Sequence, residues 1–259
     1  PMRYAGGLLG GSWVNSFMSD LGNGLFDGAD LVANFENLNP ANTLWSKQYN
    51  LYSKVDTEEK RYLNFEKWWG GFYFMTREEI ATVVNCLFVG NKLEQGSFEI
   101  GHGKSIDLNK FKAPVVLFAS FGDNITPPQQ AFNWVAKVYG SSQEIKRKGQ
   151  VIVLVLHKSI GHLGIFVSAK IARTQHKEII GSFDMLEFLP PGLYELVFEE
   201  ENPKSPEQGY SARFVEREVD DILGYDDGLA DEEAFYSVRT VSTINNTLYQ
   251  TFVSPWIKM

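Results

Sequence analysis

An acidic residue and a histidine lie in the two segments of this sequence that are best suited to acid–base chemistry. Asp123 lies in Ser120-Phe-Gly-Asp-Asn-Ile-Thr-Pro-Pro128, and His162 lies in His157-Lys-Ser-Ile-Gly-His-Leu-Gly164. A carboxylate can fix the tautomer of an imidazole, and the imidazole can then take the proton from a Ser or Cys nucleophile. An acid followed by a histidine is the later half of such a hydrolase arrangement. We therefore predict that Asp123 and His162 are catalytic residues, with a carboxylate oxygen about 2.6 to 3.2 Å from a ring nitrogen.

Asp123 also has a simpler alternative role. Two prolines follow it, and Asp123, Asn124 or Thr126 could cap a helix that begins there. On the histidine side, Gly161 and Gly164 would let the backbone around His162 turn sharply into a cleft.

The other histidines do not indicate a site. His157 stands at the end of a predicted strand, which favours a structural role. His102 and His176 have no acidic or sulfur partners at the spacing of metal ligands. The sequence therefore predicts no metal site, and it predicts no cofactor.

The nucleophile that should precede the acid is missing from the sequence. It is expected in a strand, turn and helix with the pattern G-x-S-x-G or its cysteine variant. Cys86 lies within a predicted amphipathic helix without flanking glycines, so packing is its expected role. Ser12 has glycines only on its N-terminal side and no apolar strand before it. The stretch Gly6 to Gly11 lacks the preceding strand and the spacing of a dinucleotide-binding loop.

Two apolar runs supply the strands that must position Asp123 and His162. Pro114 to Phe121 and Val151 to Leu156 are continuous rather than alternating, as in parallel strands that are covered on both faces. Between them, Pro127 to Tyr139 has the pattern of a helix with prolines in its first turn. These three elements predict a right-handed βαβ unit. A further helix is expected from about Leu163 to Ile180.

The chain divides by composition into three zones. Residues 1–112 are rich in aromatic side chains and contain two candidate helices, Thr57 to Trp69 and Thr76 to Phe88, the second with a capping box of Thr76 and Glu79. Residues 113–190 hold the predicted strands. Residues 191–259 form an acidic C-terminal extension, in which positions 195–233 carry 14 acidic and three basic residues. Its glycines and prolines favour a solvated, loop-rich segment, and an acidic docking surface is the alternative.

Composition excludes several classes of protein. The chain has 259 residues, 44% of them hydrophobic, and a net charge of −8, so a disordered chain or a nucleic-acid-binding protein is not expected. Its longest apolar runs are far shorter than the roughly 20 residues of a membrane-spanning helix, and its first residues lack the layout of a signal peptide. A single cysteine excludes an internal disulfide. Together these features predict a cytoplasmic protein.

The two site motifs resemble those of a known family. Asp123-Asn-Ile-Thr-Pro-Pro and Ser159-Ile-Gly-His-Leu-Gly-Ile-Phe are similar to the acid and histidine motifs of polyhydroxyalkanoate synthases, a branch of the α/β-hydrolases. Four further segments resemble a bacterial group labelled poly(3-hydroxyalkanoate) synthetase-like. These segments are Asp20-Leu-Gly-Asn-Gly-Leu-Phe-Asp-Gly, Asn34-Phe-Glu-Asn-Leu-Asn-Pro-Ala-Asn42, Phe88-Val-Gly-Asn-Lys-Leu93 and Phe252-Val-Ser-Pro-Trp256. The acidic segment is not part of the synthase pattern.

The resemblance implies both a fold and an activity. In that group the nucleophile, usually a cysteine, precedes the region that matches Pro1. The chain is then an aromatic-rich, largely helical cap (1–112) followed by the C-terminal part of an α/β-hydrolase core (113–190), with a parallel sheet flanked by helices. Asp123 matches the acid of a Cys-Asp-His triad, and His162 matches its base. The implied activity is acyl transfer from hydroxyacyl thioesters, and the substrate is a hydroxyacyl-CoA or another acyl ester.

Two other functions remain open from the sequence. The same residues suit an esterase or thioesterase, in which water accepts the acyl group. A degenerate hydrolase-like module used for binding or assembly is the third possibility. If the protein is an acyltransferase with its nucleophile outside this chain, the chain alone is inactive, and a missing N-terminal part or a second chain completes the sheet. We therefore expect the Val115 and Val151 strands to pair with a strand supplied from elsewhere, because an open edge invites aggregation. A homo-oligomer is compatible with this expectation.

Overall fold

The computed structural model describes residues 8–37, 39–123, 125–162, 181, 184–200, 210–225 and 228–259. The chain divides into two compact units. Unit 1 comprises Pro1–Asn91 and Phe235–Met259, and unit 2 comprises Lys92–Ala234. The helix predicted from Leu163 to Ile180 lies outside the described residues.

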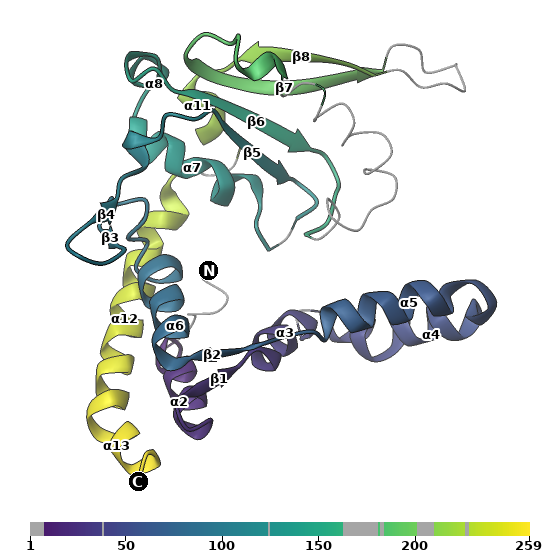
Figure 1. Ribbon diagram of the computed structural model, residues 1–259, viewed down its shortest axis with the longest axis vertical. Helices are drawn as coiled ribbons and strands as arrows, with labels where there is room; N and C mark the ends of the chain where they lie inside the picture. Colours follow the sequence, from purple (N-terminus) through teal and green to yellow (C-terminus); the bar gives the residue numbers. More distant parts are fainter. Residues whose placement is uncertain are drawn as a thin grey trace. The chain divides into compact units, whose positions relative to one another are not determined.

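Unit 2 is built on a four-stranded sheet (Figure 1). Its strands are β5 (Val115–Ser120), β6 (Val151–His157), β7 (Gly192–Glu200) and β8 (Tyr210–Glu216), in the order β5-β6-β7-β8. The first three strands are parallel, and β8 pairs antiparallel with β7. The α/β class and the parallel pairing of the two apolar runs are therefore confirmed.

Helix α7 (Pro128–Tyr139) connects β5 to β6 and has almost the bounds that the sequence predicts. It begins with a proline at its first position, where no intrahelical N–H is needed, and ends at Gly140, whose φ of +73° favours glycine. Its residues Phe132 and Val135 pack on one face of the sheet together with α8 (Ser142–Arg147) and α11 (Val219–Leu223). The opposite face carries Val153 and its neighbours, which contact Leu186 and Leu189.

The loop-rich interpretation of the acidic segment was wrong for its described residues. Strands β7 and β8 extend the sheet, and α11 covers it. Within β7, Leu193 and Leu196 are buried beside Glu195, whose charge is paired with Arg217 at 2.7 Å. The acidic residues dominate the charge count of this segment, but the apolar residues between them pack in the core of unit 2. The predicted extension 191–259 is thus divided between the two units.

Unit 1 is mainly helical (Figure 1). Its elements are α2 (Trp13–Leu21), β1 (Leu25–Asp27), α3 (Gly28–Glu36), a π-helical turn (Asn42–Ser46), α4 (Lys47–Ser53), α5 (Val55–Trp69), β2 (Phe74–Thr76), α6 (Arg77–Thr82), a second π-helical turn (Val83–Phe88), the part of α12 (Ala230–Phe252) from Phe235 onward, and α13 (Ser254–Ile257). Unit 2 also contains a short hairpin of β3 (Phe98–Glu99) and β4 (Ser105–Ile106) and a 3-10 helix (Leu108–Lys110). No helix in the described part of the chain is long and apolar enough to cross a bilayer.

Both helices predicted in the N-terminal zone are present. Helix α5 covers Thr57 to Trp69, and the second predicted helix begins with the expected capping box, in which the Thr76 hydroxyl accepts from the Glu79 N–H at 3.2 Å. Ile80 and Val84 are buried with Phe26 in the core of unit 1. Phe235 from the C-terminal helix α12 packs on the same cluster. The compact unit therefore ends before residue 112 and includes a C-terminal helix, which differs from the predicted cap of residues 1–112.

Candidate active site

Asp123 follows strand β5 and is held by several hydrogen bonds from its own turn. Its Oδ1 accepts from the backbone N–H groups of Ile125 and Thr126, both at 2.9 Å, and its Oδ2 accepts from the Thr126 hydroxyl at 2.6 Å. Burial acts to raise the pKa of Asp123, but the hydrogen bonds from Thr126, Ile125 and His162 outweigh it and hold this pKa below its ordinary value. The carboxylate is therefore ionised near neutral pH. It does not cap α7, whose N-cap position is Pro127.

His162 lies against this carboxylate. Its Nδ1 is 2.9 Å from Asp123 Oδ2 and 3.2 Å from Oδ1, so the predicted separation is confirmed. An ionised carboxylate only accepts hydrogen bonds, so the proton of this contact belongs to Nδ1. In the neutral imidazole, Nε2 is then the basic nitrogen. The Asp123 side chain is 10% exposed and the His162 side chain 32% exposed, which leaves the histidine the more accessible of the two.

The loops that carry the two residues are locked together. The Phe121 N–H donates to the His157 carbonyl at 2.9 Å, which continues the pairing of β5 and β6 past the end of β5. Next to it, Gly122 lies so close to the other loop that an added Cβ would be 2.4 Å from the Ser159 carbonyl carbon. Only glycine permits this approach. The register of the two parallel strands thus places Asp123 and His162 side by side at their carboxyl ends, where sites of α/β sheets form.

His157 shapes the turn that leads to His162. Its Nδ1 accepts from the backbone N–H groups of Ser159 and Ile160, each at 3.1 Å. This agrees with the predicted structural role. Gly161, which we expected to allow a sharp turn, has no positive φ, and no atom of the described residues lies within 4 Å of an added Cβ. Gly164 lies outside the described residues.

The remaining described histidine, His102, does not belong to this site. His102 is exposed on a turn with a φ of 52°, and His176 lies outside the described residues. Within the described ranges, no three His, Cys, Asp or Glu side chains are grouped as metal ligands.

The two weak nucleophile candidates of the sequence both belong to unit 1. Cys86 is a half-buried free thiol in the π-helical turn Val83–Phe88. Ser12 is buried, and its backbone N–H donates to the Ser242 hydroxyl of α12 at 3.0 Å. In the described part of the chain no strand leads directly into either residue, so neither has the geometry of a nucleophile elbow.

Unit 1 contains a second buried carboxylate that the sequence did not indicate. The Asp20 side chain has no exposed surface, and its Oδ2 accepts from the hydroxyls of Tyr249 and Ser254, both at 2.7 Å. Arg77 forms a two-pronged ion pair with it. Burial acts to raise the pKa of Asp20, and the hydroxyls and Arg77 lower it further than burial raises it. All of these partners lie on the helices α6, α12 and α13, which is the arrangement of a structural tie rather than a site.

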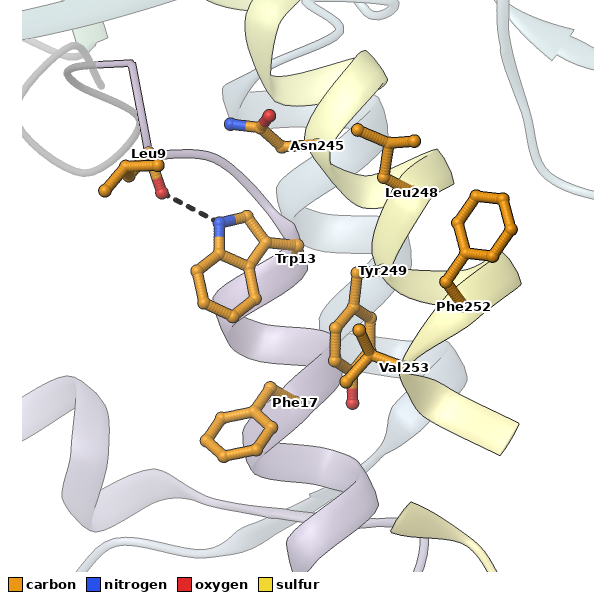
Figure 2. A pocket seen from close by; sticks show the side chains of 8 residues that line it. All are labelled: Leu9, Trp13, Phe17, Asn245, Leu248, Tyr249, Phe252 and Val253. Atoms are coloured by element: carbon orange, nitrogen blue, oxygen red, sulfur yellow. Dashed lines mark hydrogen bonds between the residues drawn. The ribbon is translucent and has the colours of Figure 1, made fainter. Parts of the chain in front are cut away.

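An apolar groove of about 470 Å³ is also found in unit 1 (Figure 2), and it shares Tyr249 with this tie. Its lining includes Trp13 and Phe17 from α2 and Leu248, Tyr249 and Phe252 from α12. The Tyr249 ring packs against both rings of α2, with its centroid 5.8 Å from that of Trp13 and 6.2 Å from that of Phe17. The polar donors of its lining are used within the protein: the Trp13 indole N–H donates to the Leu9 carbonyl at 2.9 Å, and the Tyr249 hydroxyl donates to Asp20. The groove therefore offers apolar surface without a reactive group.

Comparison with known proteins places the chain in a family. The family described as "Protein of unknown function (DUF3141)" matches residues 1–259. A Rhizobium meliloti protein described as "Uncharacterized protein in ackA 5'region" is 52% identical over 264 residues, which cover 100% of this chain and 36% of that protein. The chain thus spans about a third of the length of this relative. No solved structure matches it. The chain belongs to the DUF3141 family.

Proposed function

We propose that this chain supplies the acid and the base of a hydroxyacyl transferase similar to the polyhydroxyalkanoate synthases. The observation that carries the proposal is the contact of 2.9 Å between Asp123 Oδ2 and His162 Nδ1 at the ends of two adjacent parallel strands. In this mechanism His162 takes the proton of a cysteine thiol through Nε2, and the thiolate attacks the carbonyl carbon of a hydroxyacyl-CoA thioester. The bond between that carbon and the CoA sulfur breaks, and CoA leaves as the thiol with the proton that His162 held. The acyl group, now on the cysteine, passes to the hydroxyl group of a second hydroxyacyl unit, whose proton His162 accepts. Asp123 orients the imidazole and stabilises the imidazolium that forms.

The cysteine comes from outside this chain in our proposal. The relative from Rhizobium meliloti is almost three times as long as the matched region, which leaves ample length for a strand and a nucleophile turn. The sheet has room for that strand: among the described residues, β5 pairs only with β6. The second edge of β6 is covered by β7, so the expectation that the Val151 strand also needs an outside partner was wrong. The proposed complete protein, which contains this chain and the cysteine, is the longer polypeptide.

The exposed aromatic side chains of unit 1 support the proposal that the substrate carries an apolar acyl chain. Between Trp45 and Phe74, seven of its aromatic side chains are exposed, namely Trp45, Tyr49, Tyr52, Trp68, Phe72, Tyr73 and Phe74. Exposed apolar groups in this number are unusual for a surface that faces only water. They suit binding of an apolar acyl chain, which is the role of the cap in the enzymes that the sequence resembles.

The test is turnover of a 3-hydroxyacyl-CoA by the longer polypeptide, followed as release of CoA. His162→Asn should lower kcat by several orders of magnitude, because the base is lost. His102→Asn is the matched control, since His102 is exposed on a turn whose left-handed backbone asparagine accepts. It should leave kcat unchanged.

The products separate the candidate functions. An oligomeric or transferred hydroxyacyl product supports the transferase, whereas a stoichiometric yield of the free hydroxy acid identifies a thioesterase with the same residues. Absence of CoA release in the unchanged protein would overturn both enzymatic functions and leave a binding module. Equal release in the unchanged protein and in His162→Asn would exclude His162 as the base and overturn the proposed mechanism.

A further inference from the structure

The Thr126 hydroxyl touches both members of the candidate pair. Thr126 Oγ1 is 2.6 Å from Asp123 Oδ2 and 3.2 Å from His162 Nδ1, and those two atoms are 2.9 Å apart. The three atoms form a closed triangle. The sequence suggested Thr126 only as a helix cap, but its side chain makes no bond to the first turn of α7.

The positions of the protons in this triangle follow from the charge of Asp123. The carboxylate is ionised, so it donates nothing, and the short contact to Thr126 must use the hydroxyl proton. That leaves the oxygen lone pairs of Thr126 directed at His162, whose Nδ1 carries the second proton. The Nδ1–H is then shared between Asp123 Oδ2 and Thr126 Oγ1. A bare imidazole nitrogen in this place would face two acceptor oxygens, which is unfavourable.

We infer that Thr126 is a positioning residue for the proposed reaction: its hydroxyl, by donating to Asp123 and accepting from His162, holds the imidazole in the Nδ1–H tautomer and in one orientation. The inference rests on the proposed function for its catalytic meaning. Its geometric part does not, because the state of the His162 ring is measurable without a substrate.

A purely structural role for Thr126 makes a different prediction. The backbone N–H of Thr126 donates to Asp123 Oδ1, and this bond shapes the turn whatever side chain is present. Valine keeps the branched shape and the N–H but loses the hydroxyl, and serine keeps the hydroxyl but loses the methyl group. Thr126→Val and Thr126→Ser therefore separate the hydroxyl from the packing of the side chain.

The experiment compares these variants in the longer polypeptide labelled with ¹⁵N-histidine. The readout is the downfield Nδ1–H resonance of His162, identified by its disappearance in His162→Asn. We expect Thr126→Val to broaden or remove this signal and to lower kcat between about tenfold and about a hundredfold, the loss that goes with one hydrogen bond to a charged group, with little change in KM. Thr126→Ser should retain both the signal and most of kcat. Thr126→Ala makes the same deletion if valine is not tolerated.

The control is Thr76→Val, which removes a capping hydroxyl of α6 in unit 1. It should lower the melting temperature without changing the His162 signal. An unchanged Nδ1–H resonance in Thr126→Val or Thr126→Ala overturns the inference, as does the same loss in Thr126→Ser. If the resonance responds to Thr126 as expected but CoA release does not depend on His162, the positioning stands and the proposed function fails.

Discussion

Asp20 and Asp123 are two buried carboxylates whose pKa values are both lowered, although burial alone would raise them. In each case the compensation comes from donors placed by the backbone fold: hydroxyls and Arg77 for Asp20, a threonine and two backbone N–H groups for Asp123. What distinguishes them is the last partner. Asp123 faces an accessible histidine, whereas the Asp20 side chain is enclosed entirely by its partners. The buried ion pair of Asp20 and Arg77 therefore restrains the structure, and the pH dependence of its contribution to stability can be predicted.

The pKa of Asp20 makes the stability of unit 1 sensitive to acid. Because this pKa is lower in the folded chain than the ordinary value of about 3.9 in the unfolded chain, its stabilisation is complete above about pH 4. It is lost as pH falls through the lower, folded pKa. Asp20→Asn should therefore flatten the acid limb of a plot of urea midpoint against pH, while costing about 3 kcal/mol or more at neutral pH because Arg77 loses its partner.

The matched control for this measurement is Asp56→Asn, which removes an exposed acid of α5. Its acid limb should follow that of the unchanged protein. The idea fails if Asp20→Asn loses stability in acid as steeply as the unchanged protein does. At alkaline pH, burial and the hydrogen bond to Asp20 raise the pKa of Tyr249 to about 12. The contribution of Tyr249 to the free energy of unfolding is therefore complete below pH 10 and is lost as pH rises through about 12.

At the level of single residues, the sequence predicted the pair and missed its surroundings. Asp123 and His162 could be found because each lies in the loop that follows an apolar run, and the carboxyl ends of parallel strands lie at the same edge of a sheet. The second contact of Thr126 could not be found, because it depends on a loop 36 residues further along the chain. The sequence around Asp20 shows a family resemblance but no pattern that indicates a buried ion pair. The partners of Asp20, Tyr249 and Ser254, are more than 200 residues away in sequence.

At the level of elements, the approach of the β5 and β6 loops depends on one glycine. Gly122→Ala would place a methyl group 2.4 Å from the backbone of Ser159, and a backbone cannot rotate away as a side chain can. The loops must separate, and the cost should be about 1 to 3 kcal/mol in the free energy of unfolding. Because separation also lengthens the contact between Asp123 and His162, turnover should fall by more than stability alone explains.

Gly161→Ala is the comparison for this variant. It adds the same methyl group to the neighbouring loop, but no atom of the described residues lies within 4 Å of that position. Thermal unfolding of the two variants should therefore differ clearly, with Gly161→Ala close to the unchanged protein. Equal melting temperatures for the two alanine variants would show that the close approach of the loops is not a constraint.

The sequence predicted the elements that depend on local patterns and missed those that depend on distant partners. Local spacing of apolar residues, prolines and capping residues indicates α5, α7 and the capping box of Thr76, and the predicted bounds of these helices agree with the structure to within a few residues. Strands β7 and β8 were missed because their apolar residues are mixed with acids. Glu195 becomes acceptable in the sheet only through Arg217, which comes from the segment after β8. Such compensation between distant segments leaves no local signal.

At the level of the whole molecule, composition suggested three consecutive zones, and the chain instead returns to its first unit at its end. Phe235 and Val238 of α12 pack against the cluster that includes Phe26 and Ile80. Closing this core requires residues that are about 200 positions apart, and no period or charge count in the sequence reports such a pairing. The predicted cap of residues 1–112 included the N-terminal part of this core but not its C-terminal helix.

The open edge of β5 leads to a prediction for the complete protein. Residues of β5 contribute to the clusters on both faces of the sheet, Ala119 on one and Val116 and Phe118 on the other, as in an interior strand. Within the described residues, however, β5 has a neighbour on one side only. If the longer polypeptide adds a strand there, the amides of β5 that point away from β6 gain hydrogen-bond partners and exchange more slowly.

Deuterium uptake read by mass spectrometry on a peptide covering β5 should therefore be slower in the longer polypeptide than in residues 1–259 produced alone. The peptide covering β6 is the internal control, because β5 and β7 already flank that strand and its uptake should change little. Equal slowing of both peptides would indicate a general gain in stability rather than an added strand. Equal uptake of β5 in the two proteins would mean that the nucleophile is not delivered through this edge, and the proposed completion of the sheet would have to be abandoned.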